Sequence, residues 1–167
     1  PAALRHIAGV VLLNTTYTNP LETMVLSRLL LALQKPLLEP MMRLTIALHP
    51  IVWLSKWQSY LSGSAHLAHR LGFGKYVTRS QLEHSAFLAT RNAPGPQAKG
   101  NLPMFRWEAA GATAGLTAPL LVIGGDRDII TKAEASHEIA TATGARVEII
   151  EGVNHMGFLE RADLYNQ

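Results

Sequence analysis

Residues 119–128 read PLLVIGGDRD and residues 147–155 read VEIIEGVNH, and these two stretches decide the fold. Each opens with a short apolar run and continues into a loop that carries glycine and side chains suited to acid–base chemistry. Apolar runs of this length are typical of strands that are buried on both faces, as in a parallel sheet. The sequence therefore predicts two strands, from Leu120 to Ile123 and from Val147 to Ile150.

The segment between these strands carries the signals of one helix. Thr131 and Glu134 have the spacing of a T-x-x-E capping box, in which two side chains satisfy amide donors at the start of a helix. Gly144 stands where a glycine commonly ends a helix. We predict a helix from Lys132 to about Thr143, and with it a right-handed parallel β-α-β unit.

Polar side chains follow both predicted strands. Asp126 and Asp128 come just after the first strand, and His155 comes just after the second. The carboxyl ends of parallel strands meet at one edge of a sheet, where such sheets bind ligands. A carboxylate beside a histidine fixes the imidazole tautomer and stabilises its charged form, as a general base requires. We interpret an aspartate and His155 as such a pair, against the alternative of a turn-capping aspartate and an ordinary loop histidine.

Upstream, the pattern changes from strand to helix. Residues 7–13, IAGVVLL, form another short apolar run and predict a third buried strand. From Leu21 to Leu61 the residues Leu, Met and Ala dominate, and three prolines mark boundaries of several short apolar helices. Glycine, proline and helical periodicity predict the rest: a loop or a helix-loop joint over 62–74, a helix over 78–91, a loop over 92–101 and a helix over 102–111.

Composition limits the possible functions. The chain has 167 residues, of which 48% are hydrophobic and 16% are charged, so it can bury a core. Its 15 Lys and Arg residues are scattered, and without a basic stripe we expect no nucleic-acid partner. The absence of cysteine excludes disulfides and thiolate catalysis. Charged residues interrupt the apolar stretch 21–61, so core or cap helices are favoured over a membrane span or a membrane-surface segment.

The two quoted stretches resemble parts of a known superfamily. Residues 119–128 resemble the acid-bearing strand and turn of the α/β-hydrolases, and residues 152–161 resemble their histidine loop and the helix after it. In that pattern a glycine lies three residues before the acid, as Gly125 does before Asp128. The resemblance therefore implies that Asp128, rather than Asp126, is the catalytic acid, with His155 as the catalytic base.

The resemblance also implies the fold class and the domain organisation. The fold class is α/β, comprising the C-terminal strands of a parallel α/β-hydrolase sheet with an inserted helical cap. Residues 8–14 resemble the strand that follows the nucleophile helix, and residues 19–115 fall where the family inserts its cap. The expected domains are a core strand over 1–18, a helical cap or lid over 19–115, and a C-terminal core with the acid and histidine loops over 116–167.

The family's nucleophile has no counterpart in this sequence. In the family it precedes the acid and the histidine and sits in a G-x-S-x-G elbow. The nearest glycine context, Ser62-Gly63-Ser64, lacks the flanking glycines and a preceding strand. The chain opens at Pro1 and stops at Gln167 without a clear end signal. We therefore expect a fragment that is inactive alone and that either self-associates or is complemented by an N-terminal part.

The implied parent is a hydrolase that needs no cofactor. We expect it to cleave lipophilic esters or related acyl substrates by a Ser-Asp-His mechanism, with a small lipophilic substrate as its partner. Two alternatives stay open: an aspartate nucleophile would make the parent an epoxide hydrolase or a haloalkane dehalogenase, and a non-catalytic fragment would bind an apolar ligand or partner through its cap. The sequence shows no signal-peptide pattern, and the cytoplasm is the favoured location.

Two further groups of side chains have competing interpretations. Three aromatic residues share one helical face, at i, i+4 and i+7: Trp53, Trp57 and Tyr60. We interpret them either as core or cap packing or as a wall of an apolar acyl pocket. Three histidines have a spacing that would allow them to bind one metal ion: His66, His69 and His84. We weigh a metal site against ordinary histidines and predict no metal site.

Overall fold

A computed structural model describes residues 6–113 and 116–167 of the chain. Within these residues one parallel sheet has the strand order β1 (Val10–Leu13), β2 (Leu120–Gly125), β3 (Arg146–Ile150). All three predicted strands and their parallel pairing are confirmed. Residues 1–5 of the first expected domain and residues 114–115 at the end of the expected cap lie outside the described residues.

The first strand is shorter than the apolar run that predicts it. The run begins at residue 7, but pairing begins at Val10, whose backbone N–H donates to the Pro119 carbonyl at 2.9 Å. The partner strand β2 starts only after Pro119, because proline has no amide hydrogen to donate to a ladder. Residues 7–9 therefore have no strand partner among the described residues and stay outside the sheet.

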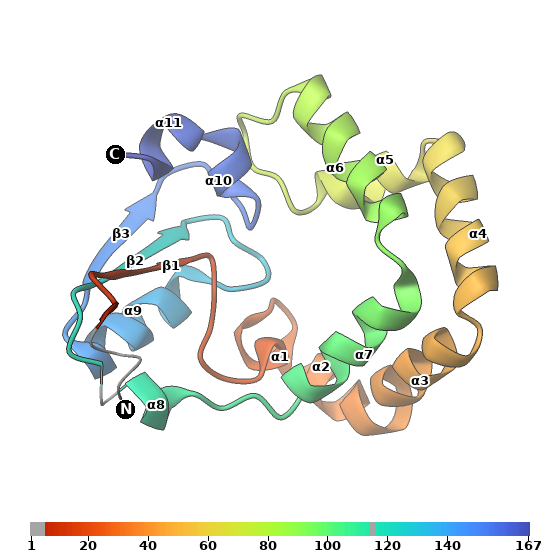
Figure 1. Cartoon of the computed structure of the whole chain (residues 1–167). Coiled ribbons are helices and arrows are strands. Elements are labelled where there is room, and N and C mark those ends of the chain that lie inside the picture. Colours follow the sequence, from red (N-terminus) through yellow and green to blue (C-terminus); the bar gives the residue numbers. More distant parts are fainter. Residues whose placement is uncertain (1–5, 114–115) are drawn as a thin grey trace.

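The helix α9 (Ala133–Thr143) connects β2 to β3 and covers one face of the sheet (Figure 1). Gly144 ends it with φ of +71°, as predicted. The contact with the sheet is close: a Cβ atom built on Gly124 would lie 2.6 Å from the Ser136 hydroxyl oxygen. Ile139 on α9 and Val122 on β2 are both buried there and form the centre of the core.

The predicted capping box at the start of α9 is wrong. No side chain caps this helix, and the Thr131 hydroxyl instead donates to an Asp128 carboxylate oxygen at 2.8 Å. A buried carboxylate is a stronger acceptor for a hydroxyl than the neutral groups at a helix end, because charge-assisted hydrogen bonds are roughly twice as strong. Thr131 is therefore part of the acid's surroundings rather than a helix cap.

The face of the sheet opposite α9 is open. Val11 and Leu13 point to this face from β1, at the edge of the sheet, and Val11 is 56% exposed. Leu121 and Ile123 continue the same face on β2, because they pair with Val11 and Leu13 in the parallel register. This face is apolar on β1 and β2, whereas β3 contributes Arg146 and Glu148 to it. Within the described residues the outer edge of β1 has no strand partner.

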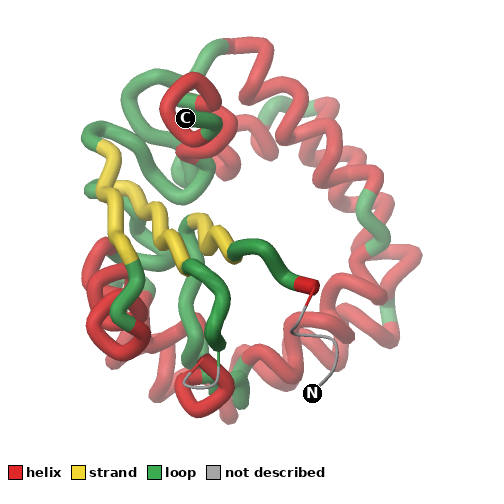
Figure 2. The backbone as a smooth tube through the Cα atoms, turned by 60° about the vertical axis from the view of Figure 1, so that its left-hand side comes forward, coloured by secondary structure: helices red, strands yellow, loops and turns green. Residues whose placement is uncertain are grey.

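The chain between β1 and β2 forms what we call the helical insertion, residues 20–113. Figures 1 and 2 show it curving away from the sheet and back as an arc. The arc is thin, because no residue of its helices α2, α4 and α5 is buried. Its elements are α1 (Pro20–Thr23), α2 (Ser27–Leu33), a π-helical turn η2 (Gln34–Leu38), α3 (Glu39–Ala47), α4 (His49–Leu61), α5 (Ser64–Arg70), α6 (Arg79–Arg91), α7 (Pro94–Met104) and α8 (Ala110–Thr113).

Proline and glycine signals led to one wrong loop prediction in this insertion. The loop predicted over 92–101 is wrong, because α7 begins there with Pro94 and Pro96 in its first turn. Proline is tolerated at that place, since the amides of a first turn have no helical partner. The stretch 62–74, predicted as a loop or a helix-loop joint, contains α5. The helix predicted over 102–111 is only partly present, because α7 ends at Met104 and α8 begins at Ala110.

Two short helices end the chain, α10 (Gly157–Glu160) and α11 (Ala162–Tyr165), next to the loop after β3 (Figure 1). Among the described residues no single helix is long and apolar enough to cross a membrane. The segments 27–47 and 49–61 reach that length and hydropathy only together, and they are bent by 97° where they meet.

Candidate active site

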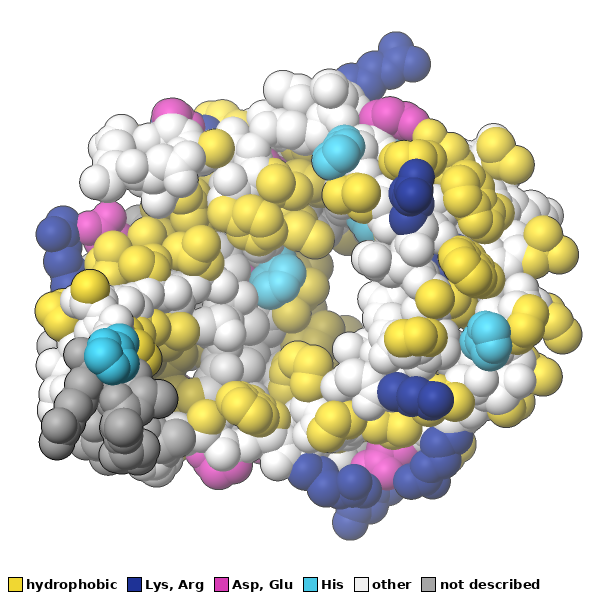
Figure 3. Space-filling view, viewed as in Figure 1, with side chains coloured by type: hydrophobic (Ala, Val, Ile, Leu, Met, Phe, Trp, Pro, Cys, Tyr) yellow, Lys and Arg dark blue, Asp and Glu magenta, His cyan; other side chains and the backbone are white. Residues whose placement is uncertain are grey.

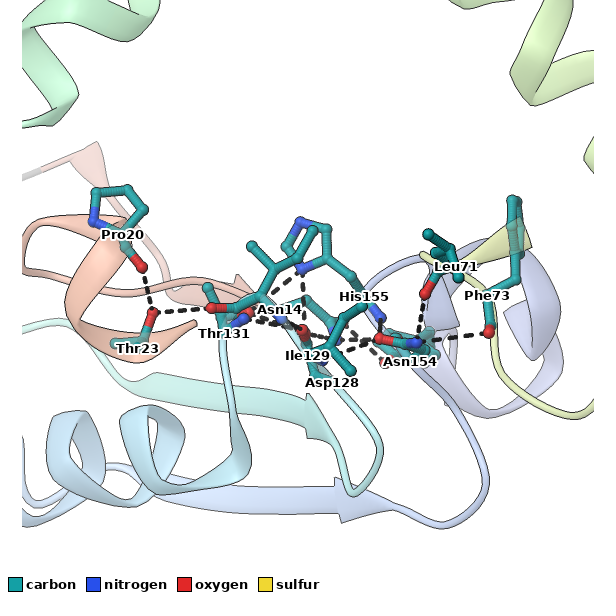
Figure 4. A network of polar contacts seen from close by, with 12 residues as sticks. Asn14, Pro20, Thr23, Leu71, Phe73, Asp128, Ile129, Thr131, Asn154 and His155 are labelled. Atoms are coloured by element: carbon teal, nitrogen blue, oxygen red, sulfur yellow. Dashed lines mark hydrogen bonds and ion pairs between the residues drawn. The ribbon is translucent and has the colours of Figure 1, made fainter. Parts of the chain in front are cut away.

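Asp128 and His155 meet at the carboxyl ends of β2 and β3. The Asp128 Oδ2 atom lies 3.0 Å from His155 Nδ1, and the Asp128 side chain is completely buried whereas that of His155 is 26% exposed (Figure 4). Both strands end at the same edge of the sheet because they run parallel and are paired directly. The structure thus brings together the two residues that the sequence singled out.

The Asp128 carboxylate is surrounded by donors. Its Oδ1 atom accepts the backbone N–H groups of Ile130 and Thr131, both at 2.8 Å. Its Oδ2 atom accepts the Thr131 hydroxyl at 2.8 Å and the Asn14 amide at 3.0 Å, besides the histidine. Burial by itself raises the pKa of the Asp128 carboxyl group, but hydrogen bonds from His155 and Asn14 outweigh it and hold the pKa below its usual value. Asp128 is therefore ionised at neutral pH.

Asp126 has a different partner. Its Oδ1 atom accepts the backbone N–H of Gly152 at 2.7 Å, so it joins the loop after β2 to the loop after β3. No hydrogen bond between Asp126 and His155 occurs within the described part of the chain. Asp128, and not Asp126, is the aspartate in contact with the imidazole.

Asn154, which the sequence analysis did not single out, fixes the backbone around the pair. Its side-chain oxygen accepts the N–H groups of His155 at 2.8 Å and Ile129 at 3.1 Å. Its amide nitrogen donates to the Leu71 carbonyl at 2.8 Å, on the helical insertion. One buried amide therefore links the acid loop, the histidine loop and the insertion (Figure 4).

A cavity of about 490 Å³ adjoins His155. Ile130 and Thr131 contribute to its wall from the acid loop, and Pro20, Met104 and Trp107 contribute apolar groups from the insertion. Within residues 6–113 and 116–167 no group bonds His155 Nε2, and Figure 4 shows the ring turned away from the sheet. The space-filling view shows the molecule hollowed between the sheet and the insertion (Figure 3). The free ring nitrogen is therefore open to a ligand in this hollow.

The segment that carries Met104 and Trp107 is held against the loop after β1. The Asn19 side-chain amide donates to the Phe105 carbonyl at 3.0 Å, and the Ala109 N–H donates to the Tyr17 carbonyl at 2.7 Å. These bonds place two large apolar side chains over the end of the sheet. The sequence offered no signal for this, because the bonded residues are separated by more than 80 positions.

The three aromatic residues singled out from the sequence lie elsewhere. Trp53 donates its indole N–H to the Thr90 carbonyl at 2.6 Å, and the Trp57 ring packs edge-on against Phe87 at 6.2 Å. Tyr60 bonds to Glu83. All three pack α4 against α6, and none of them lines the cavity beside His155. The contacts of these three side chains thus agree with the packing interpretation. The wall of the cavity beside His155 is formed by other residues.

The three histidines that were considered as metal ligands, His66, His69 and His84, do not form a metal-binding group with other described residues. His66 bonds to Glu83 at 2.6 Å, and His69 bonds to the Ser85 hydroxyl at 3.1 Å. Within the described ranges there is no group of three or more histidine, cysteine, aspartate or glutamate side chains that could hold a metal ion.

Comparisons with known proteins identify the fold but not the activity. No family model matches the sequence, and no curated protein sequence matches it. The structure is similar to an esterase from Thermogutta terrifontis, with a TM-score of 0.65 and 15% identity over 99% of this chain and 55% of that chain. It is similar to the α/β fold family hydrolase of Bacillus anthracis str. Sterne, with a TM-score of 0.58 and 13% identity over 96% of this chain and 56% of that chain. The Exiguobacterium antarcticum esterase EaEST matches 72% of this chain and 45% of its own, with a TM-score of 0.57 and 14% identity.

Identities this low establish the fold alone, and the chain spans about half the length of the solved structures that it matches. The chain therefore has the fold of an α/β-hydrolase, of which it comprises the C-terminal strands of the parallel sheet and the helices inserted between the first two of them.

Proposed function

We propose that this chain supplies the acid and the base of a serine hydrolase that cleaves lipophilic carboxylic esters. Asp128 is the acid, His155 is the base, and the nucleophilic serine belongs to a part of the protein outside these residues. One observation carries the proposal: a buried, ionised carboxylate lies 3.0 Å from His155 Nδ1, while the other face of the ring borders a cavity.

The proposed mechanism follows from the roles of the two ring nitrogens. With its proton on Nδ1 and directed at Asp128, His155 has a lone pair on Nε2 that accepts the proton of the serine hydroxyl. The serine oxygen then attacks the ester carbonyl carbon, and the charged imidazole is stabilised by the Asp128 carboxylate. His155 next passes the proton to the departing alcohol oxygen. A water molecule, deprotonated by the same nitrogen, then attacks the acyl carbon, and His155 returns the proton to the departing serine oxygen, which frees the carboxylic acid product.

The cavity supports a small lipophilic substrate. Its volume of about 490 Å³ lies in the range of ordinary small-molecule sites, roughly 300–1,000 Å³. Pro20, Met104 and Trp107 offer apolar surface to a substrate chain, and the Thr15, Thr16 and Thr131 side chains supply few polar groups. The two solved structures described as esterases favour an ester over an epoxide or a haloalkane.

The test is turnover by the longer protein that carries the nucleophile. We expect it to hydrolyse p-nitrophenyl butyrate, and we expect Asp128→Asn to lower kcat on the order of 10⁴-fold, because the amide holds the wrong imidazole tautomer. Asp126→Asn is the matched control: it keeps an oxygen for the Gly152 amide and is expected to change kcat less than about tenfold. The 167-residue chain alone is expected to show no turnover.

Two outcomes would reject the proposal. Hydrolysis of an epoxide or a haloalkane with no ester turnover would indicate an aspartate nucleophile. Ester turnover by the 167-residue chain itself, abolished by His155→Ala, would place the nucleophile within these residues.

A further inference from the structure

A chain of hydrogen bonds reaches Asp128 from the far end of the sequence. The Tyr165 hydroxyl donates to Asn14 Oδ1 at 2.9 Å, and Asn14 Nδ2 donates to Asp128 Oδ2 at 3.0 Å. The three residues come from three elements: α11, the end of β1 and the loop after β2. The chain therefore connects the acid of the site to two elements that carry neither the acid nor the base.

The backbone places Asn14 for this contact. Its N–H donates to the Ile123 carbonyl at 2.9 Å and extends the β1–β2 ladder by one residue. Its φ of +42° lies in the left-handed region, which asparagine adopts more readily than most other residues. Its side chain is turned inward and only 5% of the residue is exposed. A buried amide needs partners for both its oxygen and its nitrogen, and Tyr165 and Asp128 supply them.

The Asp128 carboxylate, which can only accept hydrogen bonds, determines which end of the Asn14 amide faces it, and Tyr165 engages the other end. Burial raises the pKa of the Tyr165 hydroxyl to about 12, against the lowering effect of its bond to Asn14, and the charges of Asp128 and Glu160 raise it further. The hydroxyl therefore stays protonated and donates a hydrogen bond to Asn14 Oδ1. Nδ2 faces Asp128 because the reversed amide would place Oδ1 against a carboxylate oxygen, and the Tyr165 hydroxyl satisfies Oδ1 from the other side.

The space for the Tyr165 hydroxyl depends on Gly157. A Cβ atom built on Gly157 would lie 2.5 Å from the hydroxyl oxygen. The helix α10, which follows the histidine loop, thus leaves room for the tyrosine to reach Asn14.

Asn14 differs from the backbone donors to Asp128 because it comes from a distant part of the chain. Ile130 and Thr131 lie two and three residues after Asp128, so their bonds fix the carboxylate within its own turn. Asn14 belongs to the neighbouring strand, and its Nδ2 also lies 3.4 Å from the carbonyl oxygen of Asn154, the residue before His155. Besides His155 itself, Asn14 thus ties the carboxylate to the histidine loop, and it does so from a third element of the fold.

We infer that Asn14 is a positioning residue that holds the Asp128 carboxylate in line with His155 Nδ1, and that Tyr165 holds the Asn14 amide in place by engaging its Oδ1 atom. This inference rests on the proposed function, because it assigns a role within the same acid–histidine pair. Asn14 acts through Asp128, and Tyr165 acts through Asn14.

The test is the exchange rate of the His155 Nδ1 proton, measured by proton NMR on the 167-residue chain with ¹⁵N-labelled histidine. The resonance is assigned by its loss in His155→Ala. We expect Asn14→Leu to speed exchange roughly ten- to hundredfold, because a hydrogen bond to a charged group is removed. Tyr165→Phe keeps the ring and removes only the hydroxyl, so we expect a smaller increase of the same sign. If Asn14→Leu does not fold, Tyr165→Phe still tests the inference.

The matched control is Tyr17→Phe, which removes a hydroxyl that forms no hydrogen bond within residues 6–113 and 116–167, and which we expect to leave the exchange rate unchanged. In the longer protein we expect Tyr165→Phe to lower kcat while KM for p-nitrophenyl butyrate stays the same, because Tyr165 does not line the cavity.

Unchanged exchange of the Nδ1 proton in both variants would overturn the inference, and so would a loss of thermal stability with exchange and kcat unaltered. If the longer protein hydrolyses no ester but the proton responds as expected, the positioning role stands and the proposed function fails. The two proposals are therefore tested separately.

Discussion

Gly125 and Val153 lie so close together that a Cβ atom on Gly125 would meet the Val153 carbonyl oxygen at 2.5 Å. The same carbonyl accepts the backbone N–H of Arg127 at 3.1 Å. The loops after β2 and β3 are thus in direct backbone contact just before they deliver Asp128 and His155. The distance between Asp128 and His155 therefore depends on the absence of a side chain at Gly125.

Gly125→Ala should therefore separate the two loops. We expect the free energy of unfolding to fall by about 1–3 kcal/mol, the usual cost of forcing extra atoms into a packed site. Urea unfolding measures this, and exchange of the His155 Nδ1 proton reports the separation. Gly100→Ala is the control, because no atom lies within 4 Å of its Cβ position and it sits inside α7. It should stabilise the helix by roughly 0.5–1 kcal/mol, and equal losses in both variants would contradict the argument.

The lowered pKa of Asp128 predicts how stability depends on pH. A carboxyl group whose pKa is lower in the folded state than in the unfolded state stabilises the fold above its unfolded pKa, about 3.9. This contribution is lost as the pH falls from that value through the lower folded pKa.

We therefore expect Asp128→Asn to lower the free energy of unfolding more at about pH 6 than well below pH 3.9, where the wild-type carboxyl is itself protonated. Urea unfolding at the two pH values measures the difference. Asp163→Asn is the control: this carboxyl also has a lowered pKa, caused by Arg161, but it is exposed and its ion pair should contribute little. A loss for Asp128→Asn that is independent of pH would refute the expectation.

Trp107 should determine which esters bind. Its side chain lines the cavity beside His155, so Trp107→Ala should raise KM for p-nitrophenyl butyrate in the longer protein more than KM for p-nitrophenyl acetate. The lost apolar contact is expected to be worth about 1–3 kcal/mol for a full side chain, or roughly five- to a hundredfold in KM. Trp57→Ala is the matched control, because Trp57 packs on Phe87 away from the cavity. Trp57→Ala should lower the melting temperature and leave the ratio of the two KM values unchanged. If Trp57→Ala changed that ratio and Trp107→Ala did not, the acyl pocket would lie at α4 instead.

The open sheet face should make the isolated chain self-associate. Val11 is 56% exposed on β1, whose outer edge has no strand partner among the described residues. Such edges and apolar patches promote pairing between molecules. Light scattering on the purified chain should show dimers or larger species, and Val11→Lys should reduce their mass. Leu61→Lys is the control, a change at a residue that is 79% exposed on α4. If only Leu61→Lys disperses the species, the insertion, and not the sheet edge, mediates association.

Much of the fold could be predicted from the sequence, because its signals are local. The apolar runs that become β2 and β3 and the glycine that ends α9 each act within a few residues. A parallel β-α-β unit then brings the two strand ends together, so the proximity of Asp128 and His155 followed from their positions in the chain. This part of the site needed no knowledge of distant contacts.

Local signals were ambiguous at other places. Pro94 and Pro96 are equally compatible with a loop and with the first turn of a helix, and only packing of α7 against α3 selects the helix. Thr131 has the spacing of a helix cap, but a buried carboxylate three residues away accepts its hydroxyl instead. In both cases the choice depended on neighbours that the local pattern does not contain.

The remainder of the site was decided by tertiary structure alone. Tyr165 and Asn14 are 151 residues apart, Asn14 and Asp128 are 114 residues apart, and no local pattern relates them. Trp107 reaches the cavity only because Asn19 and Tyr17 hold its segment over the end of the sheet. The sequence by itself determined which strands form and which acid and base follow them, since hydrophobic runs and turn residues act over short distances. Which side chains surround that pair was left to packing, because a buried polar group finds its partners wherever the folded chain brings them within hydrogen-bond distance.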